Sequence, residues 1–208
     1  MKILTAIGTA AVLAGAATAA TLATTLTLTA TPTTVAYGKA VALNGVLSTH
    51  RANQNVKVNA TECGTTTAKT VGTVKTNATG AYTMAAITNI NTTYQATQKN
   101  TKSPTVAVTV APLVKLQRVK RGSYTVSVTS AVDLKGKAIL FQRYSRLKKR
   151  WVQVKRVLLT TTTGTKPALV SAVGFNAKVA RGLRVRAAIS KAQAAPCYVA
   201  ATSNSLRA

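Results

Sequence analysis

The side chains that could perform acid–base or nucleophilic chemistry are few and widely separated along the chain. His50 is the only histidine, and Glu62 and Asp133 are the only carboxylic acids among 208 residues. Most hydrolytic and acid–base mechanisms hold a pair of titratable groups together. No serine lies in a nucleophile motif, and no glycine-rich phosphate loop is present. We therefore expect no catalytic residues and a protein that is not an enzyme.

His50 is the one candidate metal ligand or base. It lies in a polar segment, Ser48 to Asn53, between two stretches typical of strands. There is no second histidine to complete a metal site, and the neighbouring Arg51 disfavours a bound cation. We interpret His50 as a solvated loop residue and expect no metal and no cofactor.

Chemistry of another kind is concentrated in residues 138–159, which are typical of a strand, a loop and a second strand. The loop region is rich in basic and aromatic side chains and contains no acid. Flexible cations beside aromatic rings suit phosphate or sugar-phosphate polymers. Arg184 and Arg186, alternating on a later strand, add a linear array of charge. The predicted polymer-binding residues are Arg143, Tyr144, Arg146, Lys148, Lys149, Arg150, Lys155, Arg156, Arg184 and Arg186.

The same hairpin has a simpler interpretation. Its cations could merely solvate a loop, and Trp151 could be a core side chain of the fold. For Trp151 we favour the core position. For the loop cations Arg146, Lys148, Lys149 and Arg150 we favour binding over solvation.

Charge is distributed unevenly. The formal net charge is +26, and residues 113–208 contain twenty of the 28 basic residues with Asp133 as their only acid. Such an imbalance points to an anionic partner. Residues 20–112 are threonine-rich and only mildly basic, with seven basic residues against Glu62. This change in composition is typical of a domain boundary.

The first twenty residues are typical of a secretory signal peptide. Lys2 precedes an uncharged apolar run, Ile3 to Ala17, and Ala17-Thr18-Ala19 fits a cleavage site. The run is too short to span a bilayer stably. We expect a secreted protein, extracellular or associated with the cell wall, with no integral membrane segment in the mature chain.

The mature chain is predicted to be all-β. Apolar residues alternate with polar ones at Val41–Leu43, Val56–Val58, Tyr82–Ala86, Val106–Val110 and Tyr124–Val128. This period of two is that of a half-buried strand. Turn residues recur about every ten positions, which is the spacing of a sandwich. No segment after residue 20 shows a helical stripe.

The two halves of the mature chain look like copies of one another. Val56 to Val58 followed by Val71 to Lys75 resembles Ala138 to Leu140 followed by Trp151 to Lys155. Each half has the length of one immunoglobulin-like sandwich. We therefore predict a signal peptide at 1–20, a Thr-rich domain at 21–112 and a strongly basic domain at 113–208. The short linker Ala111-Pro112-Leu113 should hold the domains nearly end to end.

Several stretches resemble a known family. Thr25 to Pro32 with Val35 to Gly38, and Thr76 to Tyr82, are similar to segments of the Ig-like domains of secreted actinobacterial proteins. Phe141 to Arg143 and Trp151 to Val157 resemble the companion domain that often follows them. The resemblance implies tandem Ig-like β-sandwiches and a binding or spacer role, and it implies no catalytic residues. Fold alone does not assign a function.

Two function classes stay open. The first is a non-enzymatic module that binds anionic polymers of the cell envelope or surroundings, such as teichoic acid, nucleic acid or acidic glycans. The second is a structural, spacer or adhesin-like protein that binds a protein partner. Steep salt dependence distinguishes them, because binding to phosphate polymers weakens strongly with ionic strength. The oligomeric state is open.

Cys63 and Cys197 are the only cysteines, and export would place them where disulfides persist. If each half is Ig-like, Cys63 lies where the chain leaves the first domain and Cys197 lies where it enters the second. The short linker would bring these ends together. We predict a disulfide between the domains, and two free thiols or an intermolecular bridge stay open as alternatives. The same topology would place the loop Arg146–Arg150 at the far end of the molecule.

Overall fold

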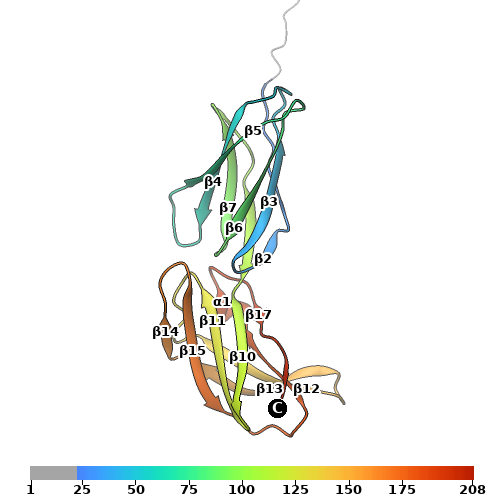
Figure 1. The fold of residues 1–208 in the computed structure, drawn as a ribbon, viewed down its shortest axis with the longest axis vertical. Coiled ribbons are helices and arrows are strands. Elements are labelled where there is room, and N and C mark those ends of the chain that lie inside the picture. Colours follow the sequence, from blue (N-terminus) through green and yellow to red (C-terminus); the bar gives the residue numbers. More distant parts are fainter. Residues whose placement is uncertain (1–22) are drawn as a thin grey trace, which may run out of the picture.

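A computed structural model describes residues 23–208, so the predicted signal peptide lies outside the described residues. The molecule is elongated, with two pairs of β-sheets stacked end to end (Figure 1). We call residues 23–111 the first sandwich and residues 113–208 the second sandwich. Strand β9 ends at Ala111 and β10 begins at Leu113, so that only Pro112 separates them. The protein is all-β, as the alternating pattern predicts.

The first sandwich consists of a three-stranded and a six-stranded sheet. The smaller sheet has the order β1-β3-β6, and all its pairs are antiparallel. The larger has the order β2-β9-β7-β4-β5, with β8 pairing β7 and with β2 parallel to β9. The strands are β1 (Thr29–Thr31), β2 (Thr34–Ala36), β3 (Lys39–Val46), β4 (Asn55–Glu62), β5 (Lys69–Lys75), β6 (Ala81–Thr88), β7 (Thr92–Gln98), β8 (Thr101–Lys102) and β9 (Val106–Ala111).

The second sandwich consists of a four-stranded and a five-stranded sheet. The first of these has the order β10-β11-β15-β14; the second has the order β13-β12-β16-β17, with β18 also pairing β16. The strands are β10 (Leu113–Lys120), β11 (Ser123–Ser130), β12 (Ala138–Ser145), β13 (Arg150–Leu158), β14 (Thr161–Thr163), β15 (Leu169–Asn176), β16 (Arg184–Ile189), β17 (Ala201–Thr202) and β18 (Leu206–Arg207).

Each sandwich core is formed by the apolar residues whose alternation predicts the strands. Val41 and Leu43 of β3 and Val56 and Val58 of β4 are fully buried in the first sandwich. In the second, Tyr124 and Phe141 lie with ring centroids 4.8 Å apart, and Phe175 lies 5.1 Å from Phe141. Since successive strand residues point to opposite faces, one apolar residue in two is enough to fill the space between the sheets.

The internal resemblance of the two halves corresponds to one structural unit. The first copy forms the antiparallel hairpin β4–β5, and the second forms the hairpin β12–β13. In both hairpins the register shifts once, at Val58/Asn59 and at Phe141/Gln142. Such a bulge bends the strand and increases its twist.

One element departs from the sequence-based expectation. A single helical turn, α1 (Lys191–Ala194), follows β16, although no helix was expected after residue 20. Four residues are too few to show a helical stripe. The turn is fixed by tertiary contacts: Ala194 is buried, and Gln193 Oε1 accepts a hydrogen bond of 2.8 Å from the Ala138 amide.

The two sandwiches are joined covalently, and the segment that follows α1 provides the joining residue. Cys63, just beyond β4, forms a disulfide with Cys197, and their Cα atoms are 5.3 Å apart. Of the three states considered from the sequence, the structure contains the bond between the sandwiches. The Asn91 amide donates to the Cys197 carbonyl at 3.1 Å, and the Val199 amide donates to the Val110 carbonyl at 2.9 Å.

Side-chain hydrogen bonds extend this interface. The Tyr198 hydroxyl donates to the Asn89 carbonyl of the first sandwich at 2.8 Å and accepts from the Ala131 amide of the second at 2.5 Å. Asn91 Nδ2 donates to the Pro196 carbonyl at 3.0 Å. On another side of the interface, the Tyr37 hydroxyl donates to the Pro167 carbonyl at 2.7 Å. These contacts hold the two sandwiches in one orientation.

Removal of the disulfide should weaken the fold. In the double variant Cys63→Ser, Cys197→Ser, the unfolded chain is no longer closed over a sequence separation of 134 residues. The loop-entropy model gives a loss of up to about 5 kcal/mol in the free energy of unfolding. Urea unfolding of both proteins measures the loss. Thiol titration of the denatured, unreduced wild-type protein is the control, and two free thiols per chain would contradict the bond.

Alkaline pH should loosen the same interface. Burial raises the pKa of Tyr198 to about 12, and it does the same for Tyr82 in the first sandwich. Since the ordinary value is 10.0, their contribution to stability is complete below pH 10 and is lost as pH rises to about 12. Unfolding midpoints across this range, with tyrosinate absorbance recorded alongside, measure the loss. The fall should be smaller in Tyr198→Phe than in wild type, and equal falls would refute the assignment to Tyr198.

Candidate anion-binding surface

The β12–β13 hairpin projects from the second sandwich at its end away from the first (Figure 1). Its last register pair is Ser145 with Arg150, and the loop Arg146–Lys149 connects them. Lys149 has a φ of 47°, the left-handed conformation that closes the turn. All four loop residues and Arg150 are exposed. The loop cations therefore lie at the far end of the molecule, as the predicted topology requires.

Strand alternation separates the hairpin side chains into two faces. Ile139, Phe141 and Val157 point into the sandwich and are buried. Tyr144 is paired with Trp151 in the register of β12 and β13, on the opposite, outer face. On the other side of β12, Gln142 is paired with Arg186 of β16, also on the outer face. This face therefore combines aromatic and cationic side chains from three neighbouring strands.

Trp151 is the centre of this outer group. The Tyr144 ring is edge-on to it, with ring centroids 5.5 Å apart. The Arg186 guanidinium lies 4.3 Å from the centroid of the Trp151 ring, and that of Arg184 lies 6.0 Å away. A cation over an indole face is attracted by the ring quadrupole. The predicted residues Tyr144, Arg184 and Arg186 are thus brought together around one ring.

The prediction that Trp151 is a core residue is wrong. It is only partly buried and lies outside the sandwich core. The reason is the bulge in β13. On a regular strand Trp151 and the buried Val157, six residues apart, would share a face, but the register shift at Phe141/Gln142 places Trp151 opposite Tyr144 on the outer face. Tyr124, Phe141 and Phe175 form the aromatic core instead.

Arg186 is held in a fixed position. Its Nε donates to Gln142 Oε1 at 2.8 Å, and its guanidinium covers one face of Trp151. Partial burial lowers the pKa of Arg186, but a guanidinium remains charged at any physiological pH. Arg184 is held by two bonds to Ser205 Oγ, of 3.2 Å from Nε and 3.1 Å from Nη2. Gln142 and Ser205 are uncharged, so neither neutralises the positive charge of the arginine that it holds.

Other predicted residues lie apart from this group. The register places Arg143 on the face opposite Tyr144, where it is paired with Val152 and Val185. The bulge beside Gln142 turns Lys155 toward the facing sheet, and its Nζ donates to the Asn176 carbonyl at 2.9 Å. Arg156 is exposed on β13 beyond the bulge. The predicted residues therefore form an outer-face group and a loop group, whereas Arg143, Lys155 and Arg156 belong to neither.

Further cations, absent from the predicted set, lie at the same end of the second sandwich. They come from the β10–β11 turn and from the loop between β15 and β16. Cavities of about 430 and 610 Å³ lie between these segments, and both are lined by Arg121. The cavity-lining basic residues are Arg118, Lys120, Arg121, Lys178 and Arg181. The run from Arg118 to Arg121 is a visible signal in the sequence, but only the fold brings Lys178 and Arg181 next to it.

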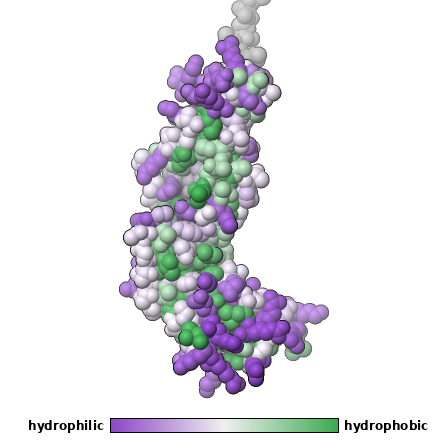
Figure 2. Space-filling view, in the orientation of Figure 1, coloured by the Kyte–Doolittle hydropathy of each residue, from purple (hydrophilic) through white to green (hydrophobic). Residues whose placement is uncertain are grey.

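We call this end the distal pole: residues 118–122 at the end of β10 and the turn after it, the β12–β13 hairpin beyond Gln142, and residues 177–186. Arg118 Nη1 donates to the Arg207 carbonyl at 3.2 Å, and Arg207 is paired with Arg184. The β10–β11 turn is thereby connected to the strand that contributes Arg184 to the Trp151 group. Figure 2 shows strongly hydrophilic surface gathered over this end and over the projecting hairpin.

No side-chain carboxylate belongs to the distal pole. Asp133, the one acid after residue 112, follows β11 at the opposite end, near the interface between the sandwiches. It accepts hydrogen bonds from Thr162 Oγ1 at 2.5 Å and from the Lys135 amide at 2.8 Å. These bonds, that from Thr162 most of all, lower the pKa of Asp133. No side-chain carboxylate therefore offsets the repulsion among the cations of the pole.

His50 and Asp133, which are candidates for acid–base chemistry, lie far apart in the structure. His50 follows β3 at the end of the first sandwich away from the interface, whereas Asp133 lies beside the interface in the second. Within residues 23–208, no group of three or more histidine, cysteine or acidic residues could hold a metal ion. No helix in the same range is long and apolar enough to cross a membrane.

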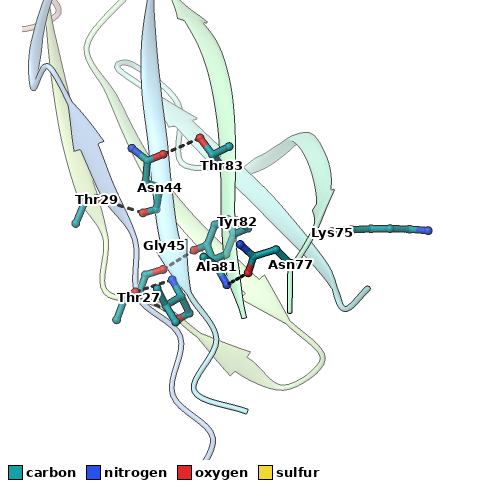
Figure 3. A pocket seen from close by; sticks show the side chains of 10 residues that line it. Thr27, Thr29, Asn44, Gly45, Lys75, Asn77, Ala81, Tyr82 and Thr83 are labelled. Atoms are coloured by element: carbon teal, nitrogen blue, oxygen red, sulfur yellow. Dashed lines mark hydrogen bonds between the residues drawn. The ribbon is translucent and has the colours of Figure 1, made fainter. Parts of the chain in front are cut away.

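A cavity of about 600 Å³ lies on the first sandwich, among strands β1, β3 and β6 (Figure 3). Thr83 Oγ1 donates to Asn44 Oδ1 at 2.6 Å, and Thr29 Oγ1 donates to the Asn44 carbonyl at 3.1 Å. Lys75 is the only charged residue that lines it. A hydrogen-bonded, nearly uncharged lining provides neither a nucleophile nor a paired acid and base.

The same region depends on a glycine. Gly45 is paired with Tyr82 across β3 and β6, and the Tyr82 hydroxyl donates to the Thr27 carbonyl. A Cβ on Gly45 would collide with both of these oxygens. The missing side chain lets the buried Tyr82 ring lie over β3 and its hydroxyl reach the Thr27 carbonyl.

Gly45→Ala should therefore destabilise the first sandwich. Displacement of Tyr82 in a packed core is expected to cost about 1–3 kcal/mol of unfolding free energy. Thermal or urea unfolding measures the change. Gly174→Ala is the matched control, because only Thr125 Oγ1, at 4.0 Å, would approach the new methyl group. Equal stability of both variants would show that Gly45 is not required for this packing.

No family model matches the sequence, and no curated protein matches it. The geometry of the distal pole is therefore the basis on which a function can be argued.

Proposed function

We propose that this protein is a secreted, non-enzymatic module that binds anionic polymers through the distal pole of its second sandwich. The observation on which the proposal rests is the concentration of cations there without a side-chain carboxylate. In a globular surface that serves only solubility, charges of both signs are normally interspersed. Here the positive charge is gathered at one end, and that end is the one farthest from the first sandwich (Figure 1).

Two kinds of cation support the proposal. The loop residues Arg146, Lys148, Lys149 and Arg150 are exposed and flexible, so they suit non-specific contacts with a charged backbone. Arg186 differs, because Trp151 and Gln142 hold it in place. A guanidinium positioned in advance loses less conformational freedom when it binds a phosphate or carboxylate. Its bond to Gln142 uses Nε and leaves both Nη groups for a bidentate contact.

We also propose that both sandwiches are immunoglobulin-like and that the protein resembles secreted actinobacterial proteins of this type. The strand order supports the first part. In the second sandwich, β10-β11-β15-β14 and β12-β16-β17 match the immunoglobulin arrangement of strands ABED facing CFG, and β13 is an additional strand beside β12. The disulfide is compatible with an extracellular location. Cell-wall association follows if the bound polymer is part of the envelope.

One observation favours the alternative of a spacer or adhesin-like protein. The disulfide, Tyr198 and Asn91 hold the two sandwiches in one orientation, as a rigid spacer requires. Binding of a protein partner by a packed interface would depend little on salt, whereas binding of a phosphate polymer would depend on it steeply. The two roles are compatible if the first sandwich holds the charged pole away from a surface.

The decisive variant neutralises the hairpin loop, with Arg146, Lys148, Lys149 and Arg150 all changed to Gln. Retention of residues 21–208 on immobilised teichoic acid, DNA, an acidic glycan and neutral dextran is measured over a range of salt concentrations. Wild type should bind the three anionic polymers and not dextran. In the variant, the slope of log affinity against log salt on the phosphate polymers should fall by up to about 3, because up to four phosphate contacts are lost.

A matched control removes the same charge from the first sandwich. It changes to Gln four exposed lysines, Lys39, Lys57, Lys69 and Lys75. If the pole is the binding surface, this control should retain most of the affinity. If both variants lose binding equally, only the net charge matters, and the site assignment is wrong. Undiminished retention of the hairpin variant at every salt concentration would refute the proposal.

A further inference from the structure

One feature of the distal pole is unnecessary for polymer binding. Leu147, in the middle of the β12–β13 loop, is 93% exposed, the most exposed large apolar side chain among residues 23–208. Arg146 precedes it, and Lys148, Lys149 and Arg150 follow. An aliphatic tip contributes nothing to contacts with a charged backbone, and it works against solubility.

A second segment of the pole has the same pattern. Val119, at a bulge near the end of β10, is 68% exposed, with Arg118 before it and Lys120 and Arg121 after it. Both segments therefore present one aliphatic side chain flanked by cations, and both lie at the same end of the second sandwich. Single exposed apolar residues are common on protein surfaces. Two at one pole, each in the same basic setting, indicate a shared contact.

The aromatic pair lies behind the hairpin tip. Tyr144 and Trp151 are paired in register, with the pair Ser145 and Arg150 between them and the loop. Leu147 is three positions beyond Tyr144, which corresponds to at most about 10 Å of extended chain. Both rings are only partly buried. From its tip to its base, the hairpin thus presents an aliphatic side chain, then cations, and then the amphipathic rings of Tyr144 and Trp151.

This order matches the layers of an anionic lipid surface. Apolar side chains of an interfacial segment enter the headgroup–acyl boundary to a depth of about 5–10 Å. Tyrosine and tryptophan favour the headgroup level, and each Lys or Arg near an anionic leaflet strengthens attachment about five-fold. The pole has no side-chain carboxylate to repel lipid phosphates.

We propose that the distal pole also docks on the surface of anionic lipid bilayers, with Leu147 inserted at the acyl boundary and Val119 as a second apolar contact. The cations that flank Leu147 and Val119 bind lipid phosphates, and Trp151 and Tyr144 lie at the headgroup level. This activity is independent of the polymer binding proposed above, since it requires the aliphatic tips in addition to the charge. The protein attaches to the surface without crossing the bilayer.

The test uses residues 21–208 with vesicles of phosphatidylcholine alone or of phosphatidylcholine mixed with phosphatidylglycerol. Co-sedimentation should show binding to the mixed vesicles only. Leu147→Ser leaves every charge in place and should weaken this binding about ten-fold, because a leucine side chain no longer enters the apolar layer. The matched control is Ile87→Ser, which removes a side chain that is 70% exposed on the first sandwich. It should bind as wild type does.

Trp151 provides a second measurement. It is the only tryptophan in the chain, so its emission reports on the base of the hairpin alone. The emission should shift to shorter wavelength with mixed vesicles, and the shift should be reduced in Leu147→Ser. Thermal unfolding of the variant without vesicles verifies that it is folded.

The outcomes separate the two proposals. Retention on teichoic acid should be the same for Leu147→Ser and wild type, so loss of vesicle binding alone supports lipid docking. If wild type and Leu147→Ser bind vesicles equally and mixed vesicles do not shift the Trp151 emission, lipid docking is overturned. The polymer-binding proposal is unaffected by that result. Weaker retention of Leu147→Ser on DNA, with vesicle binding unchanged, would also overturn it in favour of an apolar wedge between bases.

Discussion

The interface between the two sandwiches is the constraint from which the shape of the molecule follows. Cys197 and Tyr198, in the segment after β16, bind the first sandwich through a disulfide and a hydrogen bond to Asn89. Asn91 binds the backbone on both sides, since its Nδ2 donates to the Pro196 carbonyl and its Oδ1 accepts from the Val110 amide. With one linker residue, Pro112, the covalent and polar contacts leave one arrangement, end to end.

That arrangement determines where the charge of the second sandwich can act. The end next to the interface includes Asp133 and is partly covered by the first sandwich. The opposite end includes the β10–β11 turn and the β12–β13 hairpin, and it is free to meet a large ligand. Repulsion among cations falls off within a Debye length of about 8 Å at physiological salt. Cations gathered at one pole therefore act together, while those near the interface contribute little to it.

Much of the fold could be predicted from local pattern, and so could part of the site. The alternation of apolar residues predicts β3, β4 and β11, because each strand buries one face whatever the details of its neighbours. The hairpin loop is recognisable as basic in any fold. The position of Trp151 could not be predicted, because a tryptophan in a strand is buried only if it points toward the facing sheet. The bulge in β13 turns Trp151 to the outer face, and no local pattern records that bulge.

The sequence by itself determined the class of the protein: its scarcity of acids, its uneven charge and its period of two establish an all-β, strongly basic chain. The tertiary structure alone decided which cations act together. It placed Arg186 on the face of Trp151 and brought Arg181 beside Arg121 across a loop. It also turned Lys155 away from both groups, toward Asn176. The physical reason is that composition is a sum over residues, whereas proximity depends on strand register, bulges and the closing of one sheet over another.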